Sequence, residues 1–310
     1  MAVTVTTDAP AAKPSRRRPG RRLRRGEVRG MPYLLILPGF VFYALFVLVP
    51  IVDTVRLSFL EWDGLSPQVF VGLDNYVQVL SDPNTWTSLR VSLVFVLFSC
   101  LLPVAAALLL VGVIARTKIR GLSFFRFVFF LPYTIALAVV AIAWRWLYAQ
   151  DGSLNAIIRA VFGEEFVRPF LGDADLALPA LGIVGLWATF GFVVVMLLSG
   201  TQHIQKELYE AARMDGAGPV REFFTVTLPG IRHELRVSLV MTLTLALRVF
   251  DLPLMATQGG PGYATTTPSL QMYRDVFING QIGPGSAIAV LLTIVIFVGV
   301  ALVNRLVRSE

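Results

Sequence analysis

The sequence predicts an all-α integral membrane protein with six transmembrane helices, on three observations. Only 15% of the 310 residues are charged, whereas a soluble domain usually carries about 25%. Long stretches of the chain lack Asp, Glu, Lys and Arg, and the mean hydropathy is +0.70. The net charge of +7 comes from the N-terminus, because residues 1–30 hold nine Lys or Arg against Asp8 and Glu27. Lipid is therefore the expected solvent of most of the chain.

Residues 1–30 are expected to form a basic, disordered cytoplasmic tail. Its arginine runs could serve as a nucleic-acid-binding arm. Because the tail stands directly before an apolar run, a role in setting membrane orientation is favoured. Its expected partner is the anionic lipid headgroup, and not nucleic acid.

Five uncharged runs are long enough to cross a membrane, because about 20 residues at a rise of 1.5 Å span a hydrocarbon core of roughly 30 Å. They cover residues 31–52, 91–115, 127–144, 176–205 and 282–304. A sixth candidate, over 235–257, is interrupted by Arg248 and Asp251. Prolines within the runs are interpreted as kinks that a packed bundle tolerates; they are Pro38, Pro50, Pro103 and Pro132.

The lysines and arginines of the connecting segments predict the orientation. With the N-terminus inside, the cytoplasmic segments hold 20 of them and the outer segments hold five. Positive residues collect on the cytoplasmic side of membrane proteins. Both termini are therefore expected in the cytoplasm. Residues 31–88 would form the first transmembrane helix and an outer loop, and residues 89–308 the core transmembrane domain.

The cytoplasmic loop over 205–236 is longer than a helix connection needs. Residues 206–215 favour a helix, Gly216 and Gly218 favour a turn, and Pro219 suits the start of a second helix. Five basic and five acidic side chains balance its charge. Taken from these residues alone, the loop is either a rigid docking surface or an ordinary connection that happens to be helical.

Motifs for several common chemistries are missing. The sequence contains no G-x-x-x-x-G-K-[ST] loop for nucleotide phosphates, no H-E-x-x-H and no G-x-S-x-G. Cys100 is the single cysteine and there are two histidines, too few for the usual zinc sites. The chain is therefore not expected to be an enzyme, nor to hold a metal or cofactor of its own.

Part of the loop resembles the EAA loop of ABC importer permeases: Glu210-Ala211-Ala212, then Gly216, then Leu228-Pro229. Three further stretches agree with these permeases, namely Phe70-Val71-Gly72-Leu73-Asp74-Asn75-Tyr76, Leu131-Pro132 and Gly259-Gly260-Pro261-Gly262. Over about residues 31–305 the chain resembles the carbohydrate-type permeases related to the maltose, glycerol-3-phosphate, lactose and α-glucoside systems. The order of these motifs and the six-helix length are similar to those of the first of the two permeases in such systems.

The resemblance implies a type I ABC importer permease fold, a place in the bacterial cytoplasmic membrane, and transport of a sugar or sugar-like solute of oligosaccharide, glycoside or glycerol-3-phosphate type. It also implies a second homologous permease, two ATP-binding subunits and an extracytoplasmic solute-binding protein, with ATP and Mg held by the ATPase. Loop 205–236 would then dock on the ATPase. The implied coupling residues are Glu210, Ala211, Ala212, Asp215 and Gly216.

The resemblance further implies a solute site at mid-membrane, formed by spans four to six. Counting from Glu210 places Thr189, Phe192, Thr242 and Ala246 there, although Thr242 could instead only pack between helices. Arg248 and Asp251 are three residues apart, which predicts one helix face. They could line the path or form a structural ion pair at its rim. The alternative function is a secondary transporter that uses this pair as an ion relay.

Overall fold

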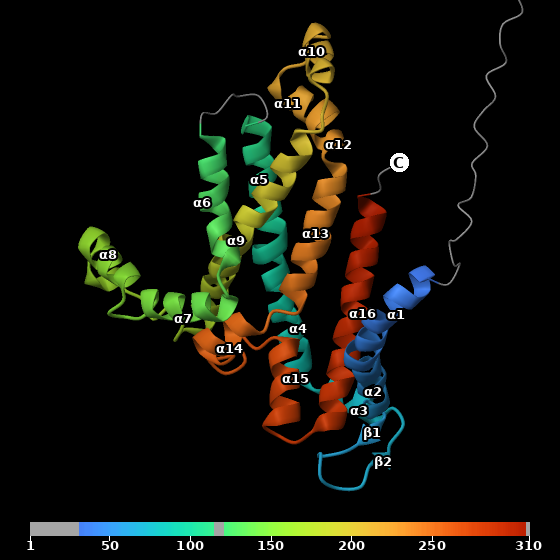
Figure 1. Ribbon diagram of the computed structural model, residues 1–310. Coiled ribbons are helices and arrows are strands. Elements are labelled where there is room, and N and C mark those ends of the chain that lie inside the picture. The colour runs from blue at the N-terminus through green and yellow to red at the C-terminus, as the bar shows by residue number, and fades with distance from the viewer. Residues whose placement is uncertain (1–30, 115–120, 308–310) are drawn as a thin grey trace, which may run out of the picture. The chain divides into compact units, whose positions relative to one another are not determined.

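The computed structural model describes residues 31–114 and 121–307, so the predicted tail over 1–30 lies outside the described residues. Within them the structure is helical apart from one small hairpin, in which β1 pairs antiparallel with β2 (Figure 1). In chain order the elements are α1 (Met31–Tyr43), η1 (Ala44–Leu48), α2 (Val49–Leu57), β1 (Leu60–Glu61), β2 (Val69–Phe70), α3 (Asp74–Ser81), α4 (Pro83–Val96), η2 (Leu97–Leu101), α5 (Leu102–Ile114), α6 (Leu122–Thr134), α7 (Leu137–Leu147), α8 (Ser153–Phe162), η3 (Glu164–Phe166), α9 (Ala174–Thr201), α10 (Lys206–Met214), α11 (Pro219–Glu222), η4 (Phe223–Thr227), α12 (Leu228–Gly230), α13 (Arg232–Leu247), α14 (Asp251–Thr257), α15 (Pro268–Phe277) and α16 (Ile282–Leu306).

Four of the described helices are long and apolar enough to cross a membrane: Tyr33–Leu57, Pro83–Ile114, Ala174–Thr201 and Ile282–Leu306. Two bent pairs, α6 with α7 and α13 with α14, raise the number to six if each pair counts as one span. The described residues therefore hold between four and six candidate spans. The helix predicted from residue 91 already begins at Pro83, because the Asp82 carboxylate caps it by accepting from the Asn84 N–H at 2.9 Å.

The chain divides into two units, residues 1–50 and 51–310. In the first unit the described residues form α1, η1 and the first residues of α2. The second unit contains the helical bundle, with the loop over 205–236 and both helix breaks.

The prediction of one continuous span over 127–144 is wrong. The chain turns by 93° between α6 and α7, where Ile135 and Ala136 adopt ψ angles of 135° and 128°. Pro132 has no N–H to donate within the last turn of α6, which weakens that turn. Pro132 thus precedes a break in the helix and not a mild kink.

The prediction that Arg248 and Asp251 share one helix face is also wrong. Helix α13 ends at Leu247 and α14 begins at Asp251, and the two axes differ by 41°. Arg248 is the C-cap of α13 and lies outside regular helix. Both side chains belong to the described part of the chain, both are exposed, and no ion pair joins them.

Three prolines are accommodated by widened helical turns. The π-helical turns η1, η2 and η4 each end two residues before a proline, namely Pro50, Pro103 and Pro229. A proline ring clashes with the carbonyl four residues earlier in a regular α-helix. The wider turn relieves that clash without breaking the helix, which explains why these prolines permit a continuous rod.

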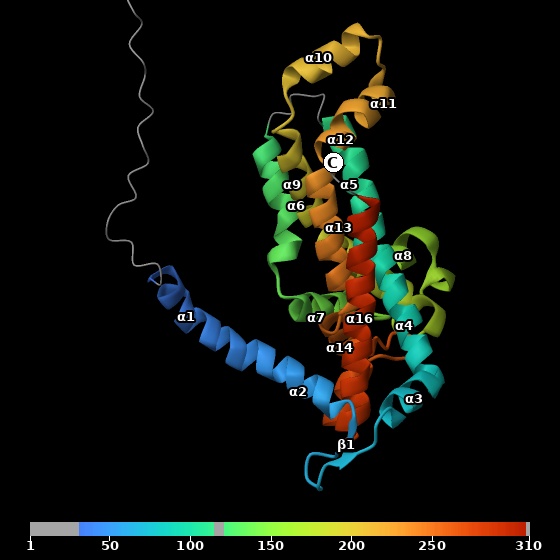
Figure 2. The same ribbon diagram turned by 90° about the vertical axis from the view of Figure 1, so that its right-hand side faces the viewer.

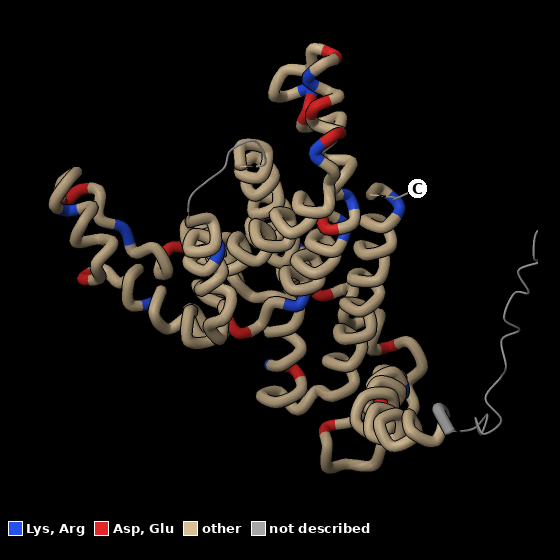
Figure 3. The backbone as a smooth tube through the Cα atoms, turned by 45° about the horizontal axis from the view of Figure 1, so that its top comes forward, with Lys and Arg blue, Asp and Glu red and all other residues tan. Residues whose placement is uncertain are grey.

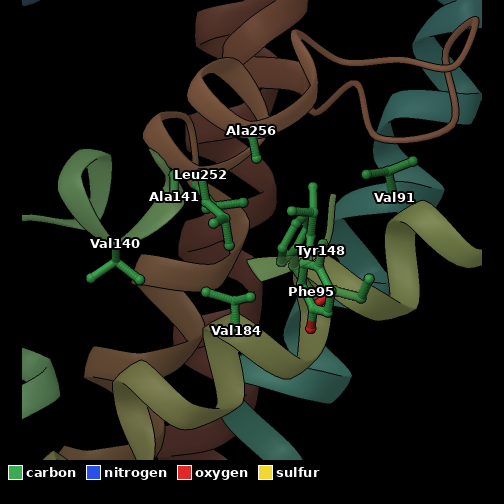
Figure 4. Packing of buried hydrophobic residues seen from close by; sticks show 11 residues of the cluster. Val91, Phe95, Val140, Ala141, Tyr148, Val184, Leu252 and Ala256 are labelled. Carbon is green, nitrogen blue, oxygen red and sulfur yellow. The ribbon is translucent and has the colours of Figure 1, made fainter. Parts of the chain in front are cut away.

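Helix α9 is the centre of the bundle. Tyr148 and Phe95 join α9 residues such as Leu181 and Val184 in one buried cluster (Figure 4), and a second cluster joins the C-terminal half of α9 to α5 and Ile231. A side chain at Gly191 would overlap the backbone carbonyl of Phe129 in α6. Glycine at this position therefore lets α6 and α9 approach closely.

The bundle separates two regions of functional interest. Helices α10, α11 and α12 lie at one end together with the C-terminal end of α16 (Figures 1 and 2). Helices α7, α14 and α15 and the β-hairpin lie at the other end. Residues of loop 205–236 therefore stand apart from the breaks at α6–α7 and α13–α14.

Candidate functional site

The loop between α9 and α13 folds as two short helices, α10 and α11, and α10 turns one face toward the protein. Tyr209 and Ala212 are half-buried, while Glu210, Ala211 and Asp215 are exposed. The Tyr209 hydroxyl lies 3.3 Å from the hydroxyl of Thr227, which is buried. Helix α10 is therefore anchored on one side and open on the side that carries Glu210.

The turn after α10 requires a glycine. Gly216 has φ +74°, in the left-handed region that other residues rarely adopt. The Ala217 N–H donates to the Ala212 carbonyl at 2.9 Å, and the Gly216 N–H donates to the Arg213 carbonyl at 3.0 Å. This pair of hydrogen bonds is the Schellman motif, in which a glycine in the left-handed conformation ends a helix.

Large apolar side chains surround the predicted coupling residues. Met214 is 89% exposed, and Val220 and Phe224 are exposed as well. Charged residues gather on the same segment, whereas the bundle below it carries few (Figure 3). Exposed apolar groups mixed with charges on an ordered segment are typical of a protein–protein contact. Of the two interpretations of the loop, docking surface or ordinary connection, the geometry favours the docking surface.

Sequence reasoning missed one feature of this loop. Arg213 Nε donates to Glu222 Oε2 at 3.0 Å, and the Glu222 side chain is only 2% exposed. The hydrogen bond from Arg213 to this carboxylate, and then their opposite charge, raise the pKa of Arg213. A buried carboxylate nine residues away across a glycine turn leaves no periodic pattern, so the sequence held no signal for it.

A cavity of about 400 Å³ lies where the two helix breaks meet α9. Its wall includes Pro132, Tyr133 and Ile135 from the α6–α7 break and the segment 248–251 from the α13–α14 break. Broken helices in membrane proteins leave backbone groups free to bind a solute, and such irregular backbone is tolerated where it lines a cavity. This cavity is the candidate solute site.

Four of the six residues predicted for the solute path line this cavity: Thr189, Ala246, Arg248 and Asp251. The Thr189 hydroxyl donates to the Gly185 carbonyl at 2.8 Å, so its hydrogen is directed at the helix backbone. Arg248 and Asp251 bring opposite charges to the wall without an ion pair between them. Two aromatic residues that sequence reasoning missed, Tyr133 and Phe250, also line it.

Phe192 and Thr242 lie outside the lining. Phe192 stacks on Tyr133 with ring centroids 4.7 Å apart, so it supports a ring that does line the cavity. Thr242 is 0% exposed, and its hydroxyl lies 2.7 Å from the Ser238 carbonyl and 3.1 Å from the Cys100 sulfur. The structure thus favours the packing interpretation of Thr242.

Comparison with known proteins assigns the chain. Residues 79–309 match the family described as binding-protein-dependent transport system inner membrane component. The chain belongs to this family. Its members are inner-membrane components, and this chain is accordingly a multi-pass protein of the bacterial cytoplasmic membrane, with the role of a transporter permease subunit and not of an enzyme.

Individual relatives of this permease family cover most of the chain. It is 37% identical over 268 residues to the probable ABC transporter permease protein YurN of Bacillus subtilis (strain 168), covering 86% of this chain and 91% of YurN. It is 33% identical over 265 residues to the trehalose/maltose transport system permease protein MalF of Thermococcus litoralis, covering 85% and 89%. Family membership gives no support to the secondary-transporter alternative.

A crystal structure shares the fold. A chain of the bacterial alginate ABC transporter, in complex with an alginate pentasaccharide-bound periplasmic protein, matches with a TM-score of 0.76 at 22% identity. The match covers 90% of this chain and 95% of that chain. The fold of this chain is therefore shared with a solved chain of an ABC transporter.

Proposed function

We propose that this permease subunit forms, with a second homologous permease, the membrane pathway for a sugar or sugar-like solute of oligosaccharide, glycoside or glycerol-3-phosphate type. A relative of known substrate class is named a trehalose/maltose permease, and the cavity wall offers aromatic faces beside charged side chains. A sugar uses both kinds of group, because its C–H faces stack on rings while its hydroxyls need hydrogen-bonding partners.

Two ATP-binding subunits on the cytoplasmic side would supply the energy and would hold ATP and Mg, since this sequence has no phosphate-binding loop. An extracytoplasmic solute-binding protein would deliver the solute, as the complex of the alginate transporter with a periplasmic protein suggests. The Glu210 carboxylate would reach a basic group of the ATPase, while Ala211 and Ala212 permit close approach. Asp215 and Gly216 shape the end of the helix.

The observation that carries this proposal is the rigid connection between loop and cavity. Helix α9 runs without a break from Thr189 at the cavity to Thr201 at the loop, about 18 Å at 1.5 Å per residue. Helix α13 returns from Arg232 at the loop to Ala246 at the cavity. A displacement of α10 by the ATPase would therefore move two walls of the solute site together.

The proposed topology has six spans with both termini in the cytoplasm, each bent helix pair counting as one span. Residues 1–30 would form the basic tail, residues 31–88 the first helix and outer loop, and residues 89–308 the core domain. The charge bias of 20 against five supports this orientation. Reporter fusions after Gln281 should read outside and fusions after Glu310 inside; the reverse pattern would reject the topology.

Transport itself is tested in proteoliposomes that hold the permease pair and the ATPase. The binding protein is first screened against a sugar panel by thermal shift, and the sugar that stabilises it is radiolabelled. We expect uptake to require ATP and the loaded binding protein, and to persist when a protonophore collapses the proton gradient. Uptake that needs the gradient and ignores ATP would favour the ion relay through Arg248 and Asp251.

A further inference from the structure

A charged pair joins the two short helices of the coupling loop. Arg213 is in the last turn of α10, and Glu222 is the last residue of α11. Between them lies the left-handed turn at Gly216. The Nε–Oε2 distance of 3.0 Å is that of a charge-assisted hydrogen bond, so the pair closes the loop across its turn.

The two members of the pair differ in their exposure to solvent. The Arg213 side chain is 56% exposed, whereas the Glu222 side chain is 2% exposed. An exposed ion pair contributes little, because water screens it and both side chains stay mobile. A buried carboxylate is costly unless it is paired, so a charged partner contributes more to it than to an exposed carboxylate. Pairing with Arg213 is therefore favourable chiefly because it compensates the buried charge of Glu222.

Glu222 is itself fixed to the bundle through its neighbour. The ring of Phe223 lies against Gly112 of α5, so close that a side chain at position 112 would meet it at 3.1 Å. The carboxylate of Glu222 therefore has a fixed position relative to α5. Through its hydrogen bond to Glu222, Arg213 ties α10 to this fixed position. Tyr209 lies on the same face of α10, and its hydroxyl is 3.3 Å from the hydroxyl of Thr227 in η4.

We infer that the Arg213–Glu222 pair positions α10 for transmission, by holding Glu210 and the exposed face of α10 at a set angle to the bundle. This inference rests on the proposed function of the loop as the ATPase docking segment. Arg213 and Glu222 are positioning residues: they act through α10 and need no contact with ATP or solute. Without the pair, α10 would keep its sequence and its docking face but could pivot on the Gly216 turn.

The mechanical consequence follows from where α10 is attached. Closure of the ATPase would push α10, and the push reaches α9 and α13 only if α10 cannot rotate by itself. A pivoting α10 would absorb the displacement locally. Loss of the pair should therefore uncouple hydrolysis from the loaded binding protein while the subunits still assemble.

The test uses the complete importer in proteoliposomes and measures ATP hydrolysis with and without loaded binding protein. We expect Arg213→Ala and Glu222→Gln each to reduce the stimulated rate by about fivefold or more, the lower range of coupling between distant sites. The KM for ATP should not change, because nucleotide binds on another subunit. The ATPase should still co-purify. Glu222→Gln keeps the size of the buried side chain, so the proposal does not depend on Arg213→Ala surviving purification.

Matched variants on the same loop separate the pair from a general loss of charge. Arg221→Ala removes an exposed guanidinium from α11 and should keep stimulation within about twofold of wild type, as surface changes usually do. Arg213→Lys retains the charge and should recover much of the stimulation. The double variant Arg213→Ala/Glu222→Gln should lose no more than the worse single variant, because both changes remove one interaction.

The outcomes are distinguishable. Stimulation of the Arg213→Ala and Glu222→Gln complexes equal to that of the Arg221→Ala control would overturn the positioning role. Additive losses in the double variant would overturn it as well, since the two residues would then act separately. A wild-type complex that shows no stimulation by loaded binding protein would instead contradict the proposed function on which the inference rests.

Discussion

Gly216 occupies a backbone conformation that costs other L-residues about 1–2 kcal/mol. Nothing lies within 4 Å of the position a Cβ would take, so conformation and not crowding restricts this site. We expect Gly216→Val to weaken ATPase co-purification and stimulated hydrolysis, because a β-branched residue resists φ +74°. Gly216→Asn should retain both, since Asn tolerates the left-handed region. Equal behaviour of the two variants would show that the turn does not need this angle.

Thr242 presents a different constraint at the scale of one side chain. It is fully buried against Ser238 and Cys100, so Thr242→Leu adds volume to a packed site, and overpacking typically costs about 1–3 kcal/mol. We expect Thr242→Leu to lower the unfolding temperature of the detergent-solubilised complex, with reduced transport following from that instability. Thr242→Ser keeps the hydroxyl and should transport normally. Normal thermal stability with blocked transport in Thr242→Leu would return Thr242 to the solute path.

Asp275 of α15 lies outside the candidate spans, and the shift of its pKa predicts that stability depends on pH. Burial raises the pKa of Asp275 in the folded protein, and the neighbouring Asp82 adds to the effect, against a hydrogen bond from Asn279. Because the pKa of Asp275 is higher in the folded than in the unfolded protein, its protonation stabilises the fold. This stabilisation is complete below the pKa of Asp in the unfolded chain, about 3.9, and is lost as pH rises through the folded-state pKa. Asp275→Asn should therefore raise the unfolding temperature at pH 8 and have less effect at pH 5. An unfolding temperature that Asp275→Asn raises equally at both pH values, or raises more at pH 5 than at pH 8, would contradict this.

Packing between whole helices depends on a few close approaches along α9. Gly191 faces the backbone of Phe129 in α6 with no room for a side chain. Gly191→Ala should separate α6 from α9 and destabilise the subunit by roughly 1–3 kcal/mol, measured by thermal unfolding in detergent. Gly218→Ala is the control, because that glycine has φ −69° and nothing within 4 Å. Similar unfolding temperatures for both variants would show that the helices adjust freely.

The elements themselves were predictable where apolar length decides the structure. Runs of more than 20 uncharged residues became continuous helices such as α9 and α16, since lipid requires every backbone group to bond within the segment. The 93° turn at Ile135 was not predictable. Its residues are as apolar as their neighbours, and the direction of α7 is set by packing of Val140 and Ala141 against α9 and α14.

The candidate sites, too, were predictable where local sequence decides the structure and not where tertiary packing does. Gly216 and the exposed face of α10 could be predicted, because capping and turn chemistry are local. The cavity could be predicted only in part: counting along the chain found Thr189 and Ala246, but which face a residue presents depends on the helix breaks. Tyr133 enters the lining and Thr242 leaves it for this reason. The buried Glu222 depends on tertiary contact and left no signal.

At the scale of the whole molecule, two uninterrupted helices join the exposed loop over 205–236 to the cavity, and the proposed function depends on α10 docking on the ATPase. Met214 on α10 is 89% exposed and suits a photo-crosslinking amino acid. In membranes that hold the complete importer, position 214 should crosslink to the ATPase on illumination. A crosslinker at Ile157 of α8, also apolar and exposed, should not. No ATPase crosslink from 214, or an equal one from 157, would contradict docking through α10.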